Sequence, residues 1–484
     1  MVDSKTIEDV IYGLCVEANT KLPDDVLQKI YKAYEIETSQ EAKQVLALIL
    51  ENAKMAYEKK MPLCQDTGQV LVFAKGKCFP DNFKEAINKG VEKAYEENFY
   101  RKSVVKNAVF DRTNTKTNTP CIIYTEFADI EGVEIELLLK GGGSENVSAV
   151  EMLSPTITED EIVEFVVSVV KKAGSKACPP YFIGIGAGGT MEYAGLLSKK
   201  ALLLEKNVDE AHEKLAEKIK NAVNGLNIGA AGLGGPSTAL DVKILTDFTH
   251  IACMPVAVTI NCHSSRHAKC VIEGTGNGED ERGKGKGERK LEIGNGELVI
   301  ENRTVRPFDP STFQLSTSLL TKKINTSDVA QLKSLKRGQN ILLSGEIYTA
   351  RDMAHKRLVE MIKKGEKLPF DLKNKIIFYA GPCPCAEDCV VGSIGPTTSA
   401  RMDKFAPILY EQGVLATIGK GERSEEVEKT VKQAGVLYFT VIGGIACYLA
   451  QKFIRKDLVA FEDLGPEAVY RFEVKDLPLR LELN

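Results

Sequence analysis

Residues 340–365 read "NILLSGEIYTARDMAHKRLVEMIKKG", an apolar, strand-like run followed directly by a helical repeat. Two more strand-like runs lie C-terminal to it, "KIIFYAG" at 375–381 and "VLYFTVIGG" at 436–444, with helical segments in the same region. Strands that alternate with helices in this way are typical of α/β domains. The stretch therefore predicts that residues 316–484 form an α/β unit.

The N-terminal half predicts a second α/β unit. Its first sixty residues have a helical pattern, in which Thr38 and Glu41 form a capping box ahead of an apolar-periodic stretch. Thr158 and Glu161 form another capping box, before a helix that Gly174 can end. The strand-like runs of this half are "QVLVFAKG" at 69–76, "CIIYTEFAD" at 121–129 and "VEIELLLKGGG" at 133–143.

A sharp change of composition separates the two units. Residues 273–297, "EGTGNGEDERGKGKGERKLEIGNGE", are rich in glycine and in charges of both signs, which is typical of an exposed hairpin or a linker. We therefore expect a two-domain α/β chain. Its parts are an N-terminal domain over 1–285, a linker over 286–315 and a C-terminal domain over 316–484.

Length and charge argue against several classes of partner. The chain of 484 residues carries a net charge of −4, which gives no electrostatic reason to expect nucleic acid or an anionic membrane. It holds no apolar run of the length that spans a bilayer. The N-terminus, "MVDSKTIEDVIYG", lacks the basic and apolar regions of a secretory signal. We expect a cytoplasmic protein.

Twelve cysteines are scattered along the chain rather than grouped as a disulfide scaffold. In a reducing compartment such thiols are core residues, nucleophiles or metal ligands. Cys383, Cys385 and Cys389 have a spacing that could hold zinc or part of an iron–sulfur cluster. No histidine is close to them in the sequence to complete a zinc site.

Two other stretches place cysteine in polar company. In "PLCQDTG", residues 62–68, Cys64 precedes an amide and a carboxylate in an expected turn, so it is either a sheet-edge thiol or a ligand. In "HIACMPVAVTINCHSSRHAKC", residues 250–270, three of the five histidines lie among three cysteines. A polar loop after an apolar strand often carries function in α/β proteins. The residues concerned are His250, His263, His267, Cys253, Cys262 and Cys270.

A glycine pattern suggests another kind of site, one that binds a dinucleotide. Gly184, Gly186 and Gly189 match the dinucleotide fingerprint, and Glu205 lies at a tolerable distance for a ribose contact. The apolar run before them is short, however. A glycine-rich backbone close to some other ligand is the competing interpretation.

Cations and hydroxyl groups in glycine-flanked turns suit a small dianion, because arginine binds carboxylates through paired hydrogen bonds. These groups are Arg101, the glycines at 141–143, Arg351, Thr397, Thr398, Arg401 and Lys420.

Nine motifs, in order, carry a resemblance to a known family. They are "PLCQDTG", "NTKTNTP", "KGGGSEN", "CPPYFIGIGAGGT", "H…PVAVTINCHSSRHA", "SGEIYTARDMAHKRL", "YAGP", "GSIGPTTSARMD" and "IGKG". The chain resembles the class I, iron–sulfur-dependent fumarase and L-tartrate dehydratase family, with a gap at 273–315. The resemblance implies that the family's alpha-like and beta-like parts are fused here. The N-terminal part would be the cluster-binding domain and the C-terminal part a swivelling β/β/α domain.

The resemblance implies a four-iron four-sulfur (4Fe-4S) cluster held by three dispersed cysteines, Cys64, Cys178 and Cys262. One iron would have no protein ligand and would be open to substrate. An open iron is a Lewis acid that can hold a carboxylate and a hydroxyl group. The resemblance does not call for the three cysteines at 383–389, whose role stays open.

The resemblance also implies roles for the surrounding residues. Asp66 would deliver a proton to the departing hydroxyl, Thr397 would remove the C–H proton, and His250 would lie near the active site. Because the residues come from both halves of the chain, the site should lie where the domains meet. The residues that would bind the carboxylates are Gln65, Arg101, Gly142, Arg351, Arg401 and Lys420.

The activity implied is the reversible hydration of fumarate to malate, a reaction of the tricarboxylic acid cycle. The expected partners are a small dicarboxylate substrate and a second copy of the chain in a homodimer. Dehydration of L-tartrate and hydration of mesaconate are close alternatives. A non-catalytic iron–sulfur or redox sensor is the alternative of another class. Such a sensor needs a cluster but not the carboxylate-binding groups Arg401 and Lys420.

Overall fold

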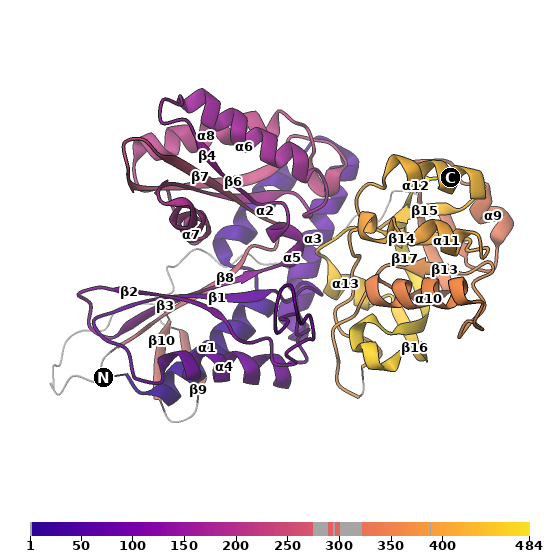
Figure 1. The fold of residues 1–484 in the computed structure, drawn as a ribbon, viewed down its shortest axis with the longest axis horizontal. Coiled ribbons are helices and arrows are strands. Elements are labelled where there is room, and N and C mark those ends of the chain that lie inside the picture. The colour runs from indigo at the N-terminus through magenta and orange to yellow at the C-terminus, as the bar shows by residue number, and fades with distance from the viewer. Residues whose placement is uncertain (1, 274–288, 294–295, 301–321, 388) are drawn as a thin grey trace.

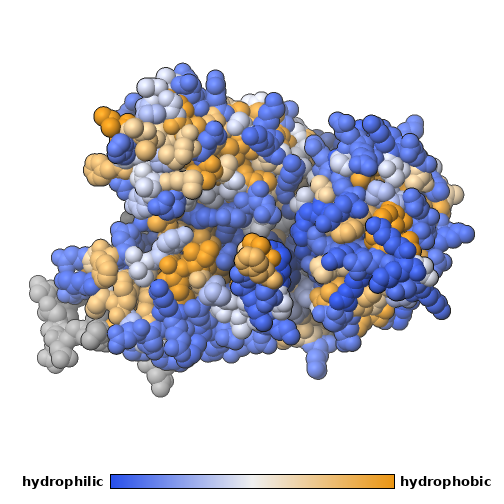
Figure 2. All heavy atoms as spheres, viewed as in Figure 1, coloured by the Kyte–Doolittle hydropathy of each residue, from blue (hydrophilic) through white to orange (hydrophobic). Residues whose placement is uncertain are grey.

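The computed structural model describes residues 2–273, 289–293, 296–300, 322–387 and 389–484. The N-terminal helices and sheets lie on one side of Figure 1, and the C-terminal sheet with its helices lies beside them. Both parts combine helices with sheets, so the predicted two-domain α/β fold is confirmed. Every helix in the described ranges is too short or too polar to cross a membrane. The face drawn in Figure 2 is mainly hydrophilic, with hydrophobic residues in separate groups.

Two four-stranded sheets form the N-terminal part. One has the strand order β2-β1-β3-β8, and α1 and α4 share an apolar core with it. The other has the order β4-β7-β5-β6 and is packed by α6, α7 and α8. The strands are β1 (Gln69–Gly76), β2 (Ile122–Phe127), β3 (Val133–Lys140), β4 (Ala149–Leu153), β5 (Tyr181–Gly189), β6 (Ala239–Thr249), β7 (Met254–Asn261) and β8 (Arg266–Ile272). The helices are α1 (Ser4–Thr20), α2 (Asp24–Ile36), α3 (Gln40–Lys59), α4 (Phe83–Glu97), α5 (Gly142–Glu145), α6 (Glu159–Ala173), α7 (Met191–Ala201) and α8 (Glu210–Asn224).

One seven-stranded sheet forms the C-terminal part, in the order β11-β12-β13-β14-β15-β17-β16. The long strand β17 also pairs with β12, so the sheet curves back on itself. Its strands are β11 (Lys322–Asn325), β12 (Asn340–Thr349), β13 (Ile376–Phe378), β14 (Ala416–Gly419), β15 (Leu437–Thr440), β16 (Phe453–Ala460) and β17 (Val469–Leu483). Its helices are α9 (Val329–Lys333), α10 (Asp352–Lys364), α11 (Ala406–Tyr410), α12 (Glu425–Ala434) and α13 (Ala446–Ala450).

A short antiparallel hairpin lies between the two parts in the sequence. It pairs β9 (Arg289–Ile293) with β10 (Gly296–Ile300), and β10 contacts β8. The neighbouring residues 274–288, 294–295 and 301–321 lie outside the described ranges. The domain boundaries at 285 and 316 and the linker over 286–315 therefore stay predictions.

The two predicted helix caps have different outcomes. At α6 the capping box of Thr158 and Glu161 is present in both directions, and Gly174 follows as the C-cap, so this prediction is confirmed. At α3 the predicted cap on Thr38 is wrong. The N-cap is Ser39, whose hydroxyl accepts a hydrogen bond from the Ala42 amide over 3.3 Å. The periodic pattern located the helix, but two adjacent hydroxyl residues could not be told apart without the backbone.

The glycine-rich fingerprint lies within strand β5 rather than in a loop that follows one. A Cβ atom on Gly184 would lie 2.0 Å from the carbonyl oxygen of Ser198, and one on Gly186 would lie 2.2 Å from that of Ala194. Both acceptors belong to α7, so these glycines allow the helix to lie directly on the strand. The dinucleotide interpretation is not supported, and the close neighbour of this backbone is a helix of the same chain.

This close packing predicts a large effect of one methyl group. Gly186→Ala should lower the free energy of unfolding by about 3 kcal/mol, because the backbone of α7 must move to admit the new atom. Gly195→Ala on the same helix is the matched control, since a Cβ there meets nothing within 4 Å. The control should stabilise the protein by about 1 kcal/mol through helix propensity. Urea unfolding of both variants measures the contrast, and equal midpoints would contradict it.

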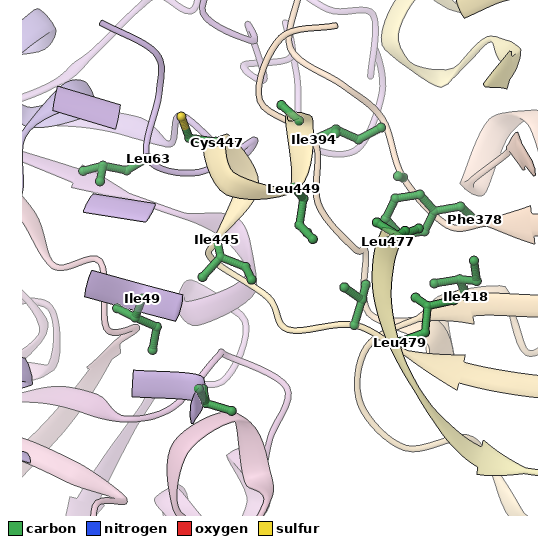
Figure 3. Close-up of a cluster of buried hydrophobic side chains, with 14 of the residues drawn as sticks. Ile49, Leu63, Phe378, Ile394, Ile418, Ile445, Cys447, Leu449, Leu477 and Leu479 are labelled. Atoms are coloured by element: carbon green, nitrogen blue, oxygen red, sulfur yellow. The ribbon is translucent and has the colours of Figure 1, made fainter. Parts of the chain in front are cut away.

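A shared apolar core joins the two parts. It combines side chains of α3, such as Ile49, with C-terminal side chains such as Ile445 and Leu449. Figure 3 shows these groups approaching one another at the junction. Asn52 adds polar contacts, because its side chain donates to the carbonyl of Leu63 over 3.0 Å and accepts from the amide of Tyr448 over 2.9 Å. The relative position of the two parts is therefore fixed by buried contacts.

Candidate active site

Three cysteines from distant parts of the sequence gather near the junction. Cys64 precedes β1, Cys178 precedes β5 and Cys262 follows β7. Burial raises the pKa of Cys64 and of Cys178, and the nearby Cys262 thiol raises both further. From the C-terminal part, the Lys420 ammonium donates to the Cys178 sulfur over 2.9 Å. The structure therefore brings together the three predicted cluster ligands and one predicted substrate-binding lysine.

Bare backbone from the C-terminal part lies against these side chains. A Cβ atom on Gly443 would lie 2.4 Å from the Cys178 sulfur. A Cβ atom on Gly444 would lie 2.2 Å from Nε2 of His263, and the φ of Gly444, +82°, also favours glycine. His263 Nε2 lies 3.1 Å from the carbonyl oxygen of Gly443. Two glycines in succession thus allow the C-terminal part to approach the cysteines closely.

The charges around the cysteines suit an anionic group. Burial raises the pKa of Cys64 to about 12, and the nearby Arg266 guanidinium opposes this shift. Burial acts to lower the pKa of Lys420, but the three cysteines outweigh it and raise that pKa. Metal binding requires thiolates, which these cations would stabilise. In the described ranges, no three His, Cys, Asp or Glu side chains are placed to hold a single metal ion between them. The donor set of three soft sulfurs beside two cations fits an iron–sulfur group.

Asp66 lies beside the cysteines in a pocket of hydrogen-bond donors. Its carboxylate accepts from the amide of Gly142 over 2.9 Å and from that of Gly68 over 3.2 Å. Burial acts to raise the pKa of Asp66, but Arg101 and Arg266, together with these amides, outweigh it and lower that pKa. The predicted acid–base residue is therefore close to two predicted substrate-binding groups, Arg101 and Gly142.

Arg266 is a functional candidate that the sequence did not single out. The residue is only 2% exposed, and among the described residues its side chain makes one hydrogen bond, from Nη1 to Asn19 over 3.4 Å. Its Nε atom is buried with no hydrogen-bond partner. A Cβ on Gly141 would lie 3.7 Å from its Nη2. A buried cation with so few partners is costly unless it balances nearby negative charge. Its position in the motif "HSSRHA" was the only signal.

The C-terminal part supplies a second wall. Gln65 donates to the carbonyl of Pro396 over 3.3 Å, and a Cβ on Gly395 would lie 2.5 Å from the Gln65 side-chain oxygen. Thr397 is 8% exposed, and its carbonyl accepts from the amide of Lys420 over 3.3 Å. The predicted residues Gln65, Thr397 and Lys420 are therefore neighbours, although they come from three separate motifs.

The predicted arginines lie around one glycine and one acidic residue. Arg101 donates to the carbonyl of Gly381 over 3.2 Å, and a Cβ on Gly381 would lie 3.3 Å from Nη1 of Arg351. Asp352 accepts from Nε of Arg351 over 3.2 Å and from Arg401 through two bonds of 3.0 and 2.6 Å. Sequence reasoning missed Asp352, although it follows Arg351 directly.

His250 is the one predicted site residue that the structure does not bring to the others. It lies in the exposed turn between β6 and β7, where its Nδ1 accepts from the Ala252 amide over 3.1 Å. The surrounding motif also separates. His263 lies beside the cysteines, whereas Cys270 is buried in the core of the first sheet and His267 lies 3.7 Å from Asp25.

The local zinc motif does not close. Cys383 is buried and its thiol is directed to the carbonyl of Gln65, 3.5 Å away. Cys385 and Cys389 are instead near the surface. The Cys383 thiol is therefore directed to another part of the chain than the Cys385 thiol, which donates to the carbonyl of Cys389.

A cleft of about 330 Å³ reaches this region from the junction. Its walls come from α3, from the C-terminal end of β17 and from the segment that follows β15. Cys178, Lys420 and Gly443 line it. Its volume is typical of a site for a small molecule.

A buried histidine under this region predicts a pH dependence of stability. Burial lowers the pKa of His355 from its ordinary value of 6.5 to about 4. The unfolded chain therefore takes up a proton near pH 6.5, while the folded chain does so only near pH 4. Stability from this group is present above pH 6.5 and is lost as the pH falls toward 4.

For this histidine we expect a loss of about 2 kcal/mol between pH 6.5 and 4.5. His355→Phe should remove that part of the slope, because phenylalanine takes up no proton. The ring neighbours Tyr379 and Phe405 can pack against phenylalanine, so the fold should persist. Urea unfolding at the two pH values measures it. His250→Gln, at an exposed site, is the control and should keep the wild-type slope. An unchanged slope in His355→Phe would count against the assignment.

The fold and the site together define an α/β protein with cysteines, a carboxylate and cations gathered at the junction of its two parts. The chain matches the family described as "Fumarate hydratase (Fumerase)" over residues 8–271 and "Fumarase C-terminus" over residues 303–483. It belongs to this family, and it is a lyase, as the sequence resemblance implied.

Three relatives illustrate the similarity. "Fumarate hydratase class I, anaerobic" from Escherichia coli (strain K12) is 31% identical, over 91% of this chain and 81% of that protein. "Fumarate hydratase 1, mitochondrial" from Leishmania major is 29% identical, over 93% of this chain and 83% of that protein. A "Putative L(+)-tartrate dehydratase subunit alpha" from Methanocaldococcus jannaschii is 42% identical, over 54% of this chain and 96% of that protein.

Proposed function

We propose that the protein is an iron–sulfur hydro-lyase that reversibly hydrates fumarate to malate, the reaction of the tricarboxylic acid cycle. The observation that carries the proposal is the contact of Lys420, from the C-terminal part, with Cys178, from the N-terminal part, at 2.9 Å. It joins a predicted cluster ligand to a predicted carboxylate-binding cation. The similarity to fumarate hydratases over most of the chain supports the same substrate class.

Cys64, Cys178 and Cys262 would hold a 4Fe-4S cluster with one iron open to substrate. When bound, the cluster supplies a Lewis acid for the substrate's hydroxyl and carboxylate. Lys420 and Arg266 would balance part of its negative charge, since both lie close enough to the cysteines to act on their ionisation.

The protein groups position the dicarboxylate and move its protons. Gln65, from the N-terminal part, and Lys420, from the C-terminal part, would orient the substrate between them. Asp66 would take a proton from water in the hydration direction and return it to the leaving hydroxyl in dehydration. Thr397, whose carbonyl accepts from the Lys420 amide, would exchange the C–H proton. The remaining carboxylate ligands would be Arg101, the Gly142 amide, Arg351 and Arg401.

The turn between β6 and β7, which contains His250, supports two further proposals. They are a homodimer and a position of His250 at the contact between its two copies. Phe248, near the end of β6, and Ile251, in the turn, are 95% and 93% exposed and leave apolar area that a second copy could cover. Sedimentation of the wild type and of Ile251→Asp would test the dimer. The cytoplasmic location is likewise a proposal, supported by twelve cysteines that are all free.

Dehydration of L-tartrate is the second candidate activity, and the relative from Methanocaldococcus jannaschii favours it over mesaconate hydration. A cluster protein without turnover, acting as a sensor, is the alternative of another class. The carboxylate-binding groups around Asp352 argue against it, because a sensor does not need them.

The test is anaerobic reconstitution with iron and sulfide, followed by the ultraviolet absorbance of the fumarate double bond. Fumarate, malate, L-tartrate and mesaconate are supplied separately, so the assay also ranks the substrates. We expect turnover of fumarate and malate, and none in Cys64→Ser. Cys78→Ser, at an exposed cysteine, is the matched control and should keep full activity. A stable cluster with no turnover of any substrate would favour the sensor instead.

A further inference from the structure

The loop between β13 and Ser399 carries three cysteines that the proposed reaction does not use. Its base is closed where the amide of Cys383 donates to the carbonyl of Ser393 over 2.9 Å. The Cys383 thiol is directed inward, to the Gln65 carbonyl at 3.5 Å, and the residue is 2% exposed. Cys383 is therefore set apart from the two cysteines nearer the tip of the loop.

Cys385 and Cys389 lie side by side near that tip. The Cys385 thiol donates to the carbonyl oxygen of Cys389 over 3.2 Å, and the backbone turns because the Cys389 amide donates to Ala386 over 3.0 Å. Burial raises the pKa of Cys385, the Lys456 ammonium lowers it, and the adjoining Cys389 thiol raises it again. Cys385 is half-buried and Cys389 is exposed, so solvent reaches this pair.

We propose that Cys385 and Cys389 form a reversible dithiol–disulfide site, whose oxidant is a low-molecular-weight disulfide. A disulfide requires the two Cβ atoms about 3.5–4.5 Å apart. The Cys385 sulfur lies 3.2 Å from the carbonyl oxygen of Cys389, so the two residues are neighbours, and formation of the bond would require the loop to bring their Cβ atoms to this separation. The site does not depend on the proposed hydro-lyase activity.

Oxidation proceeds by two thiol–disulfide exchanges. The exposed Cys389 thiolate attacks one sulfur of the small disulfide, which forms a mixed disulfide and releases one small thiolate. The Cys385 thiolate, beside the Lys456 cation, then attacks the Cys389 sulfur and releases the second small thiolate. The two protons lost by the protein thiols end on the two released thiols. One disulfide is consumed, one is formed, and the small disulfide is reduced.

The loop that carries Cys385 and Cys389 also contacts the candidate active site. The two ends of the loop carry the carbonyls of Gly381 and Pro396, which accept from Arg101 and Gln65. The oxidisable pair is therefore part of the same loop that contacts the candidate active site.

The test uses the full-length protein, equilibrated without oxygen in mixtures of glutathione and glutathione disulfide. Samples are quenched in acid, alkylated and digested with trypsin, which releases residues 376–401 as one peptide with all three cysteines. We expect that two of the three thiols of this peptide escape alkylation in the oxidising mixture. Dithiothreitol should restore both.

Single substitutions identify the pair. Cys383→Ser should keep the protected pair, whereas Cys389→Ser should abolish the internal disulfide. Cys78→Ser, at the other exposed cysteine, should leave the peptide's behaviour unchanged. Three outcomes would overturn the proposal. They are full alkylation of all three thiols in the oxidising mixture, a protected pair that includes Cys383, and a lasting glutathione adduct on Cys389 of the wild type.

Discussion

Asp66→Asn is expected to lower kcat by about 10³-fold while the iron and sulfide content stays at the wild-type level. An asparagine oxygen can still accept the Gly142 amide bond, so the local structure should persist. The amide cannot carry the proton that moves between water and substrate. The loss should therefore fall on kcat and only weakly on KM.

The measurement is steady-state fumarate hydration by the reconstituted enzyme, with iron determined in the same samples. Asp129→Asn replaces an exposed carboxylate on the same half of the chain, and it should keep wild-type kcat. A kcat for Asp66→Asn within about tenfold of the wild type would remove Asp66 from the proton transfer. A parallel loss of iron would show that Asp66 acts on the metal centre instead.

Arg266→Met is expected to weaken iron retention by about 10- to 100-fold. The guanidinium is buried against Asp66 and Cys64, and it favours the negative charge of both. Methionine fills similar space without the charge, so three thiolates and Asp66 would lose one of their few cations. Arg266→Lys keeps the charge and should retain part of the wild-type affinity.

Loss of the visible cluster absorbance during titration with an iron chelator measures this effect without any turnover. The control is Arg455→Met, which removes a guanidinium that is largely exposed and paired with Asp457. The control should release iron at the wild-type chelator concentration. If Arg266→Met also did so, Arg266 would have no part in balancing the metal centre.

The sequence predicted the local elements well because their signals are local. The capping box at Thr158 and the strand at 69–76 match the structure, since each depends on neighbours in the chain. The same local view failed at Gly184 and Gly186. Their spacing imitates a phosphate loop, but the close neighbour that requires glycine is α7, which no fingerprint includes.

The motifs also predicted most of the candidate site, and the structure brought Cys64, Cys178 and Cys262 together near Lys420. Charge balance was not readable from them. Arg266 and Asp352 lie within or beside quoted motifs, yet their importance rests on burial and on partners from distant segments. His250 shows the converse. Its motif suggested a place in the site, but this fold leaves it outside the site.

By itself, then, the sequence determined the family, the helices and strands, and the residue types available for chemistry. The tertiary structure decided which of those residues meet, because contact at the junction depends on buried side chains such as Ile49 and Ile445 from both parts. It also decided the surroundings of each cysteine. Cys178 lies beside a lysine of the other part, whereas Cys385 is half-buried and Cys389 is exposed. Burial and proximity set charge and reactivity, and neither is a property of a residue's place in the chain.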